Sequence, residues 1–186
     1  MLFDQALDIP EILTTDKLKL TLMPERMRYS LRCKKSDLAG IKKSSGLKLP
    51  TKTGRTEMSQ AQIILCLGPD EWLVIADAKE KNKLKKIFAK IEKDYVVSIT
   101  DISHRNIRLG ITGQNAVAAL NVGCPLDLSL DAFPIGKTTR TVFESVTIIL
   151  TRTGVNDFNI ECWRSFAPYI RDFFSRIAND INAVST

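Results

Sequence analysis

The sequence predicts an α+β fold in which helices pack on mostly antiparallel sheets and in which one strand-rich unit occurs twice. Residues 71–91 align with residues 157–177 without a gap. In both segments a strand with alternating apolar residues precedes a helix whose apolar residues recur at i, i+3, i+4 and i+7. Turn residues separate neighbouring strands, as they do in hairpins. Pairs of strands followed by a helix, found twice, are typical of the α+β class.

A second pair of segments strengthens the repeat. Residues 28–49 resemble residues 106–128, since in each an alternating strand runs through a polar turn into a short helix near a glycine. Two matches in the same order indicate a duplication, so we expect a single domain made of repeats at about 17–95 and 96–183. The one long polar stretch, residues 44–59, is predicted to be a mobile loop.

The same patterns place the individual elements. Strands are expected near residues 17–23, 27–33, 60–67, 71–77, 96–102, 105–112, 138–144, 146–152 and 157–163. Helices are expected near residues 36–44, 79–93, 114–121 and 165–182. Gly46 and Gly123 are predicted to end helices, because glycine enters the left-handed region at low cost. Residues 68–70 and 144–145 have the composition of tight turns, and Ser165 is predicted to cap the last helix.

The composition predicts a soluble, globular protein. Of the 186 residues, 44% are hydrophobic and 26% are charged, which is typical of folded domains. The longest apolar runs have the length of strands, far below the roughly 20 residues that a membrane-spanning helix needs. Residues 1–13 contain acidic residues and no early Lys or Arg, unlike a secretory signal or a transit peptide. We therefore expect a cytoplasmic protein with no membrane partner.

The cysteines and the histidine predict neither a metal site nor disulfides. The four cysteines are far apart in the sequence and form no C-x-x-C pair, and His104 is the only histidine. A structural zinc site needs about four nitrogen or sulfur ligands that converge. We expect four free thiols, mostly buried in strands, namely Cys33, Cys66, Cys124 and Cys162.

The net charge of +6 is unevenly distributed. Residues 1–95 contain 19 Lys and Arg against 13 Asp and Glu, whereas residues 96–186 contain 8 of each. Much of the excess lies in residues 79–93, where lysines fill the polar face of a predicted helix. A nucleic-acid interface would combine Arg with aromatic residues, and this face lacks both. The main interpretation is a solvated surface, and the second is contact with a negatively charged partner protein.

Two motifs look like sites and are interpreted as turns. In "FPIGKTTRT", Gly136 precedes Lys and Thr as in a phosphate-binding loop. That loop needs a second glycine where Asp131 stands, and it opens a helix rather than a strand. Gly136 is therefore predicted to be a turn glycine. In "GCPLDL", residues 123–128, Cys124 has no base beside it, so turn and packing are favoured over partner contact and over catalysis.

Residues 100–113 form another conspicuous stretch. Ser103 and His104 are adjacent, and adjacent residues on a strand point to opposite faces, so they are not predicted to form a catalytic dyad. Asp101 and Arg105 flank the pair and are predicted to fix a strand crossing through a charge-assisted hydrogen bond. A structural role is therefore favoured for this stretch.

Large aromatic residues are concentrated near the C-terminus. Trp72 and Trp163 lie in equivalent regions of the two repeats, where such residues more often build a core than bind a ligand. The segment "CWRSFAPYIRDFF" adds Phe166, Tyr169 and two further Phe residues. That is more than one helix needs, so part of this surface is predicted to face another protein chain.

Four motifs also carry a family resemblance. The stretches "LGPDEWLV", "DISHRNIRLGITGQNAVAALNVGCPLDL", "AFPIGKTTRTVF" and "FNIECWRSFAPYIRDFF" resemble, in order and spacing, the gamma subunit of heterotetrameric sarcosine oxidase. The resemblance covers roughly residues 25–180. The motif residues considered as a possible interface are Trp72, Asp101, His104, Arg105, Gly123, Cys124, Pro125, Asp127, Gly136, Arg140, Trp163, Arg164, Phe166 and Tyr169.

The resemblance implies a non-catalytic subunit in a complex with alpha, beta and delta chains. In that family the complex demethylates sarcosine to glycine, forms hydrogen peroxide and passes the one-carbon unit to tetrahydrofolate. FAD, FMN, NAD and tetrahydrofolate are implied for the whole complex. The resemblance assigns no catalytic, cofactor-binding or metal-binding residue to the gamma chain, so none is predicted here, and catalysis is expected in the alpha and beta chains.

A more distant similarity concerns the fold. The stretch "DISHRNIRLGITGQNAVAALN" is similar to part of the T-protein aminomethyltransferases of glycine cleavage, whose folate-binding domain is a duplicated α+β unit. No counterpart of the catalytic aspartate of those enzymes is identifiable in this sequence. Two alternatives to the subunit therefore stay open. One is a free-standing folate or one-carbon binding protein of the same fold, and the less favoured one is a basic nucleic-acid-binding module.

Overall fold

The computed structural model describes residues 11–14 and 17–184, and it groups the chain into two compact units. Unit 1 comprises Met1–Pro24 and Arg105–Thr186, and unit 2 comprises Glu25–His104. Unit 2 is therefore one continuous stretch of chain, whereas unit 1 is assembled from the two ends of the sequence.

The prediction about the N-terminal leader rests largely on residues that lie outside the described part. Asp4 and Asp8 belong to this undescribed stretch. Among the helices that the structure describes, none is long and apolar enough to span a membrane.

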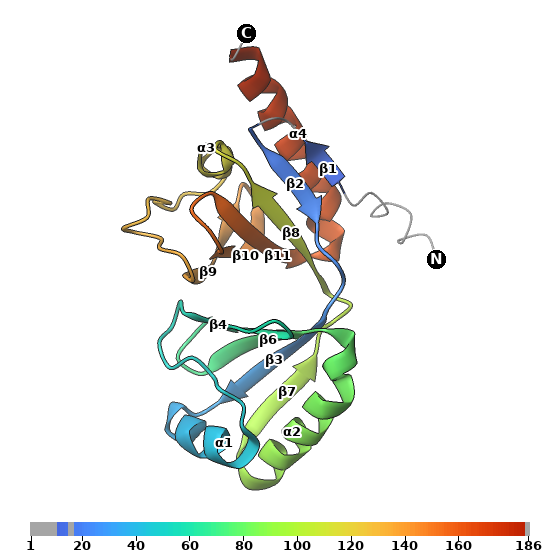
Figure 1. Cartoon of the computed structure of the whole chain (residues 1–186), viewed down its shortest axis with the longest axis vertical. Coiled ribbons are helices and arrows are strands. Elements are labelled where there is room, and N and C mark those ends of the chain that lie inside the picture. The colour runs from blue at the N-terminus through green and yellow to red at the C-terminus, as the bar shows by residue number, and fades with distance from the viewer. Residues whose placement is uncertain (1–10, 15–16, 185–186) are drawn as a thin grey trace. The chain divides into compact units, whose positions relative to one another are not determined.

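Unit 1 contains a six-stranded sheet in which each strand pairs antiparallel with its neighbours (Figure 1). The strand order is β1-β2-β8-β11-β10-β9. The strands are β1 (Glu11–Thr14), β2 (Lys19–Leu22), β8 (Asn106–Thr112), β9 (Thr138–Phe143), β10 (Val146–Arg152) and β11 (Asp157–Trp163). The helices are α3 (Ala116–Asn121), the 3₁₀ helix η3 (Arg164–Phe166) and α4 (Ala167–Val184).

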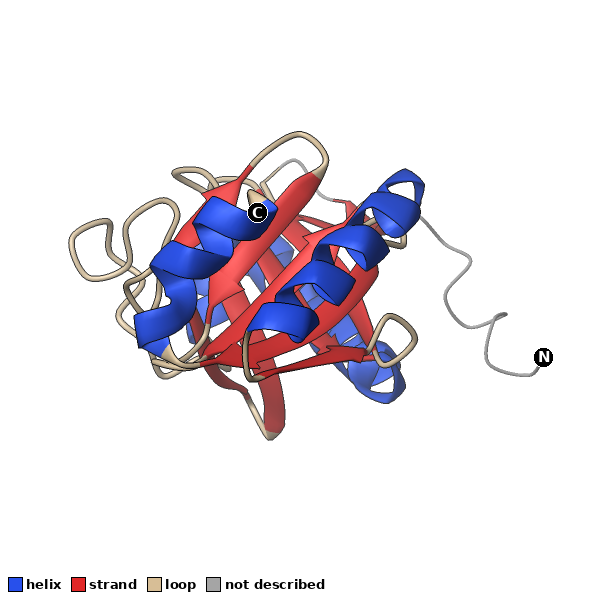
Figure 2. Ribbon diagram, turned by 90° about the horizontal axis from the view of Figure 1, so that it is seen from below, coloured by secondary structure: helices blue, strands red, loops and turns tan. Residues whose placement is uncertain are grey.

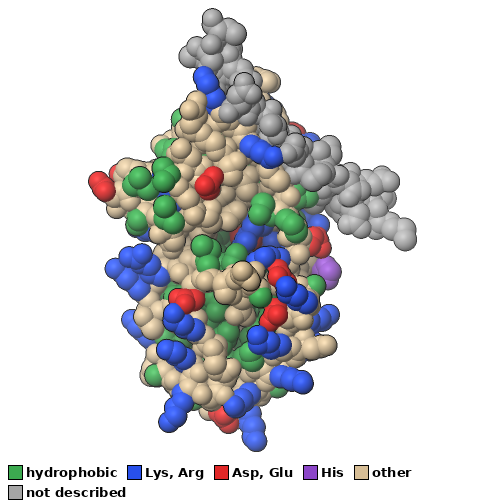
Figure 3. All heavy atoms as spheres, in the orientation of Figure 1, with side chains coloured by type: hydrophobic (Ala, Val, Ile, Leu, Met, Phe, Trp, Pro, Cys, Tyr) green, Lys and Arg blue, Asp and Glu red, His purple; other side chains and the backbone are tan. Residues whose placement is uncertain are grey.

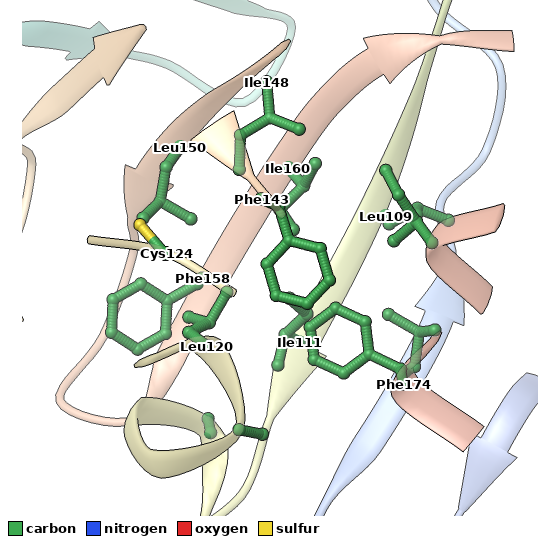
Figure 4. Packing of buried hydrophobic residues seen from close by; sticks show 14 of the residues in the cluster. Leu109, Ile111, Leu120, Cys124, Phe143, Ile148, Leu150, Phe158, Ile160 and Phe174 are labelled. Atoms are coloured by element: carbon green, nitrogen blue, oxygen red, sulfur yellow. The ribbon is translucent and has the colours of Figure 1, made fainter. Parts of the chain in front are cut away.

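The core of unit 1 forms because alternate residues of its strands are apolar. Ile107, Leu109 and Ile111 of β8 point to one face of the sheet, where they pack with apolar residues of α3 and α4. Figure 4 shows the rings of Phe143 and Phe174 next to each other in this core, with their centroids 4.8 Å apart and their planes 4° from parallel. These contacts hold the C-terminal helix α4 on the sheet.

A buried ion pair lies on the other face of the same sheet. Arg108 of β8 and Glu161 of β11 are directly opposite in the strand register. Arg108 Nε lies 2.8 Å from Glu161 Oε1, and both side chains are almost fully buried. A shift of one strand by one residue would turn its charge into the apolar core and leave the other charge buried without this partner, so the pair favours the observed alignment of the two strands.

Unit 2 contains a five-stranded antiparallel sheet with the order β4-β5-β6-β3-β7. The strands are β3 (Met27–Cys33), β4 (Thr56–Met58), β5 (Gln62–Cys66), β6 (Glu71–Ala76) and β7 (Val97–Asp101). The helices are η1 (Lys35–Asp37), α1 (Leu38–Ser45), η2 (Ala78–Glu80) and α2 (Lys81–Asp94). Both α-helices contribute to one core with Leu31 and Trp72 of the sheet, and Figure 2 shows two helices lying over the strands of a sheet.

Helix α2 has the two faces that its sequence predicts. Leu84, Phe88 and Ile91 are buried, while lysines occupy its exposed side. Unit 2 as a whole contains 17 Lys and Arg against 10 Asp and Glu, a net charge of +7. Unit 1 contains 10 against 11, a net charge of −1. The positive charge of the chain therefore belongs to unit 2, and Figure 3 shows many exposed Lys and Arg side chains in blue.

The predicted α+β class is confirmed by these two sheets and their helices. All nine predicted strands and all four predicted helices are present, with ends that differ by a few residues. Strands β1 and β4 were not predicted, because four and three residues are too few to show an alternating pattern. Strand β4 lies within residues 44–59, where Leu47 and Leu49 are buried. The mobility of that segment and the division of the chain into two repeats stay predictions.

Some predicted turns and caps are confirmed and two are wrong. Gly46 ends α1 with a φ of 75°, and residues 68–70 connect β5 to β6. Glu144 turns the chain between β9 and β10 with a φ of 54°. Gly123 follows α3, but its φ is not positive, so its role is not the predicted left-handed cap. Ser165 lies within η3, a 3₁₀ turn that starts before α4 and has no side-chain cap, so it is not the predicted cap of the last helix.

The four cysteines are free and buried. Cys33, Cys66 and Cys162 lie in strands as predicted, whereas Cys124 lies in a loop. Burial raises the pKa of the Cys33 thiol from 9.0 to about 11, and the nearby carboxylates of Asp37 and Asp70 act in the same direction. Cys33 is therefore a neutral thiol at physiological pH and a poor nucleophile.

Replacing Cys33 with Ala is expected to reduce the loss of stability at alkaline pH. Folding holds this thiol neutral with a pKa of about 11, against 9.0 ordinarily. Its contribution to the free energy of unfolding is thus fully present below pH 9 and declines as the pH rises towards 11. Urea unfolding of both proteins at several pH values between 7 and 11 measures the difference. The cavity left by the substitution lowers stability equally at every pH, so an unchanged slope above pH 9 would contradict this account.

Candidate interaction surface

Three aromatic side chains form an exposed patch on unit 1, here called the aromatic patch: Trp163, Phe166 and Tyr169. Their exposed fractions are 53%, 36% and 41%. Trp163 follows the buried Cys162 on β11, and because strand residues alternate between faces it points away from the core. The rings of Trp163 and Phe166 stack with centroids 5.8 Å apart and planes 15° from parallel. Two large rings thus cover each other on one side and leave the other side open.

Tyr169 connects the aromatic patch to the turn between β9 and β10. Its hydroxyl donates a hydrogen bond to Glu144 Oε2 over 3.2 Å, and its ring lies 6.2 Å from that of Phe173. Phe173 in turn makes an edge-on contact with the buried Phe143. The backbone N–H of Glu144 donates to the carbonyl of Gly123 over 2.6 Å. The patch is therefore connected both to the core and to Gly123 in the loop after α3.

Gly123 has a packing role at this junction. A Cβ atom at this position would lie 3.0 Å from the Phe143 ring and 3.1 Å from the backbone nitrogen of Glu144. Glycine thus allows the loop after α3 to approach the β9–β10 turn closely enough for the backbone hydrogen bond. Close packing, and not a left-handed backbone conformation, therefore explains why a glycine stands at this position.

Residues 122–137, here called the motif loop, contain both sequence motifs that were interpreted as turns. Cys124 is buried, with its Sγ 4.0 Å from Thr141 Oγ1, and Pro125 is exposed. Asp127 Oδ1 accepts a hydrogen bond from the Ser129 N–H over 2.8 Å, which is the side-chain turn that its residue type favours. Hydrogen bonds from the Ser129 N–H and hydroxyl hold the pKa of Asp127 below its ordinary value.

The second half of the motif loop is also a turn. Gly136 has a φ of 80°, and its N–H donates to the carbonyl of Arg152 over 2.9 Å. The ammonium of Lys137 donates to the carbonyl of Ala132 and lies 5.8 Å from the centre of the Phe133 ring. Gly136 is a turn glycine, as predicted, and the ammonium of Lys137 makes its hydrogen bond within the motif loop.

Arg152, which the sequence did not single out, organises the motif loop. Its side chain is 2% exposed, and its guanidinium donates hydrogen bonds to backbone carbonyls. The acceptors and N–O distances are Leu128 at 2.8 Å, Phe133 at 3.0 Å and Gly154 at 3.1 Å, together with Val155. The guanidinium carbon also lies 4.9 Å from the centre of the Phe158 ring. Burial lowers the pKa of Arg152, yet the carbonyl dipoles and the ring face stabilise the cation.

Exposed apolar side chains lie on the same loop. Val122, Leu130 and Ile135 are large hydrophobic residues with much of their surface in solvent. Hydrophobic side chains gather over the loop between α3 and β9, on the left of Figure 3. Arg140, on the adjoining edge strand β9, is also exposed. The motif loop therefore exposes apolar side chains on a backbone that the hydrogen bonds of Arg152 hold in place.

The stretch around His104 is a turn rather than a strand. Residues 103–105 form the turn that connects β7 to β8. Asp101 Oδ1 accepts a hydrogen bond from the Ser103 N–H over 2.9 Å, and Arg105 Nε donates to Asn106 Oδ1 over 3.1 Å. Each of the two charged side chains thus makes a hydrogen bond to a residue close to it in the sequence. Their role in fixing a strand crossing stays a prediction. Burial acts to raise the pKa of Asp101, but the hydrogen bonds from Ser103 outweigh it and the pKa lies below its ordinary value.

The predicted interface residues are thus distributed over three places. Trp72 is buried in unit 2, where its indole N–H donates to the carbonyl of Pro50 over 2.8 Å. Asp101, His104 and Arg105 lie at the β7–β8 turn. The remaining residues lie in unit 1, on the motif loop, on β9, or on the segment with the aromatic patch and Arg164. Trp72 is a core residue, and the interface role of the others stays a prediction.

The residues of this chain do not fit a dinucleotide cofactor. Such a site needs a glycine-rich turn from a parallel strand into a helix. The strand pairs of the described residues are antiparallel, and of the four turns that lead from a strand into a helical segment only the one after β8 contains a glycine, Gly113. The backbone of Gly113 is instead packed against Lys17. Over the described part of the chain, no group of three or more His, Cys, Asp or Glu side chains converges as metal ligands do.

Comparison with known proteins gives a consistent result. Residues 34–180 match the sarcosine oxidase, gamma subunit family. The chain is 29% identical over 132 residues to the sarcosine oxidase subunit gamma of Corynebacterium sp. (strain P-1), which covers 70% of this chain and 64% of that one. It is 24% identical over 167 residues to the corresponding subunit of Corynebacterium sp. (strain U-96), covering 89% and 76%. The match thus spans a little under two thirds of the first of these relatives.

Two solved structures share the fold. A chain of the heterotetrameric sarcosine oxidase from Corynebacterium sp. U-96 aligns with a TM-score of 0.77 and 22% identity, covering 93% of this chain and 89% of that one. The glycine cleavage system aminomethyltransferase T from Bartonella henselae aligns with a TM-score of 0.64 and 12% identity, covering 87% and 46%. The likeness to aminomethyltransferases that one sequence motif indicated is therefore a likeness of fold.

Replacing Arg152 with Leu is expected to lower the free energy of unfolding by about 2–5 kcal/mol, because the buried carbonyls of Leu128 and Phe133 lose their donor. Arg152→Lys keeps the charge but has fewer N–H donors, so the free energy of unfolding is expected to fall less than with Leu. Urea unfolding measures the stability, and limited proteolysis within residues 122–137 measures the order of the loop. Arg171→Ala, which removes an exposed pair with Asp172, is the control and is expected to change stability by less than about 0.5 kcal/mol. Equal effects of the Arg152 and Arg171 substitutions would contradict the role of Arg152.

Replacing Gly123 with Ala is expected to destabilise the chain by about 1–3 kcal/mol, since the added methyl group overlaps the Phe143 ring and the Glu144 backbone. Val122→Ala, at the exposed neighbouring position, is the matched control with an expected change below about 0.5 kcal/mol. Thermal unfolding of the two variants and of the unaltered chain measures the two changes in stability. A neutral Gly123→Ala substitution would show that the close approach is not required.

Proposed function

The chain belongs to the sarcosine oxidase gamma subunit family, and on this basis we propose that it is a non-catalytic subunit of a heterotetrameric oxidase that acts on sarcosine. The matched region covers most of both units. The family resemblance seen in the sequence motifs is confirmed by this match. The curated relatives are gamma subunits of sarcosine oxidase, and a solved structure of similar fold is named as heterotetrameric.

The aromatic patch is the observation that carries the subunit proposal. Trp163, Phe166 and Tyr169 expose large rings that are fixed by stacking, by a hydrogen bond and by the core beneath them. Rigid aromatic groups at the surface are the side chains that contribute most to binding energy in protein interfaces, because little conformational freedom is lost when they are covered. We propose that this patch and the apolar residues of the motif loop contact the alpha, beta or delta chain.

The chemistry of the complex is assigned to those partner chains. In this proposal the alpha and beta chains hold FAD, FMN and NAD and demethylate sarcosine to glycine with formation of hydrogen peroxide. The one-carbon unit passes to tetrahydrofolate, also held outside this chain, and the complex is cytoplasmic. The lack of fit between this antiparallel fold and a dinucleotide supports the absence of such a cofactor from the gamma chain.

Affinity purification tests the proposal directly. The full chain is tagged and expressed together with the candidate alpha, beta and delta chains, and the eluate is assayed for subunit composition, visible absorption and peroxide release from sarcosine. A yellow eluate that contains the larger subunits and oxidises sarcosine is expected. A colourless, monomeric chain from cells that make the oxidase would refute the proposal. Titration of the isolated chain with tetrahydrofolate would then test the alternative, a free-standing folate or one-carbon binding protein.

Removing two rings of the aromatic patch is expected to weaken assembly. The double substitution Trp163→Ala with Phe166→Ala should reduce the affinity for the partner chains at least about tenfold, since exposed rings at the centre of an interface dominate its energy. The melting temperature of the isolated chain is expected to change little, because both side chains are exposed. Val96→Ala, an exposed apolar residue of unit 2, is the control. Equal recovery of the complex with both variants would exclude the patch as an interface.

A further inference from the structure

We propose that unit 2 contains a binding site for a small organic anion, meaning a carboxylate or a phosphate ester that also carries an apolar body. The site is a cavity of about 550 Å³ between α1 and the segment of residues 48–57. Figure 1 shows this segment running from α1 to β4. The volume is within the range of roughly 300–1,000 Å³ that is typical of small-molecule sites.

The charged groups that line the cavity are mostly positive. Lys42, Lys48 and Arg55 contribute to its wall, and Glu57 is the acidic residue among its lining residues. Glu57 pairs with Lys48. Among the contacts of the described residues, Lys42 and Arg55 have no carboxylate partner. Two uncompensated cations in the lining of one cavity favour an anionic ligand, and the planar guanidinium suits the two oxygens of a carboxylate or phosphate.

The cavity also has apolar lining residues that are fixed in place. Leu38 and Ala39 of α1 line it together with Leu49 and Pro50, and Leu38 and Leu49 belong to the buried core of unit 2. The indole of Trp72 holds the carbonyl of Pro50 at 2.8 Å, so this wall is anchored to the centre of the sheet. A ligand with only a charged group would leave this surface in contact with water, whereas an apolar body would cover it.

A buried hydroxyl without a partner lies in the wall of the cavity. Thr56 of β4 lines the cavity, and its Oγ1 is buried and makes no hydrogen bond in the part of the chain that the structure describes. Buried polar atoms in folded proteins nearly always have a partner. Because this oxygen is shielded from solvent while the cavity is open, it does not face the space that a ligand would fill. Lys42 and Arg55 are therefore the polar contacts of the site.

The turn that presents Arg55 is ordered by backbone hydrogen bonds. Gly54 has a φ of 81°, and its N–H donates to the carbonyl of Cys66 over 2.8 Å. The N–H of Arg55 donates to Lys52, and the carbonyl of Arg55 accepts from Cys66 over 3.0 Å. Arg55 therefore projects from a fixed backbone, and less order has to be gained when a ligand binds.

The proposal is tested by titrating the full, ¹⁵N-labelled chain with phenyl phosphate and following its amide resonances. Saturable shifts are expected for residues 38–42 and 48–57. Inorganic phosphate lacks the apolar body and phenol lacks the charge, so both are expected to bind at least about tenfold more weakly. Benzoate is expected to shift the same amides, since the site recognises the shared anionic and apolar chemistry. Equal affinity for phenyl phosphate and inorganic phosphate would overturn the proposal, and so would the absence of saturable shifts.

Substitutions assign the contacts of the site. Arg55→Ala and Lys42→Ala are each expected to weaken phenyl phosphate binding about tenfold. Lys86→Ala removes an exposed lysine of α2 that does not line the cavity and is expected to leave binding unchanged. If the Lys86 variant weakened binding as much as the Arg55 variant, the interaction would be a general effect of the positive charge of unit 2 and the proposed site would be wrong.

Thr56→Val serves as a second control, because valine has the shape of threonine without the buried hydroxyl. Unchanged binding of phenyl phosphate is expected, with an unchanged or higher melting temperature of the free chain. A loss of binding as large as that of the Arg55 variant would contradict the assignment of the polar contacts to Lys42 and Arg55. If assembly with the partner chains shifted these amides while phenyl phosphate did not, the cavity would accommodate an acidic side chain of a partner instead of a small molecule.

Discussion

A buried cation is stable in a protein only where polar groups surround it, and Arg152 imposes this requirement on unit 1. The carbonyls that meet it come from residues on both sides of β10, including Leu128 and Phe133 of the motif loop. A loop of this length would otherwise lack regular hydrogen bonds. The position of one guanidinium at the end of one strand thus determines the path of the segment that carries two of the family motifs.

The aromatic patch depends on the same arrangement through a chain of contacts. The motif loop begins beside Gly123, whose carbonyl accepts from Glu144, and the carboxylate of Glu144 accepts from Tyr169. Phe143 links this turn to Phe173 and Phe174 of α4. A surface built in this way is already ordered before a partner arrives, which reduces the entropy lost on association.

The periodicity of apolar residues was enough to predict most of the helices and strands. The roles of individual residues, by contrast, depend on contacts between segments that are distant in the sequence. The alternation in β8 and the helical spacing in α2 are local patterns, and both elements were predicted. The acceptors of Arg152 lie 19 and 24 residues earlier in the chain, so no local pattern marked it as more than the end of a strand. Gly123 was noticed, but its neighbour Phe143 is visible only in three dimensions. The cavity beside α1 likewise joins Lys42 to Arg55 across a loop that the sequence describes only as polar.

The order of the two units along the chain has a consequence for biosynthesis. Unit 2 is a continuous run of 80 residues, and it leaves the ribosome before most of unit 1. It can acquire its own core early, since domains generally fold as units during translation. Strand β2, by contrast, is made before unit 2 but pairs with β8, which follows unit 2 in the chain, and β8 pairs with β11. Strand β2 can therefore pair only after the whole of unit 2 and β8 have been made. Unit 2, once folded, holds the two ends of its own chain in adjacent strands, β3 and β7, which shortens the search of β2 for β8.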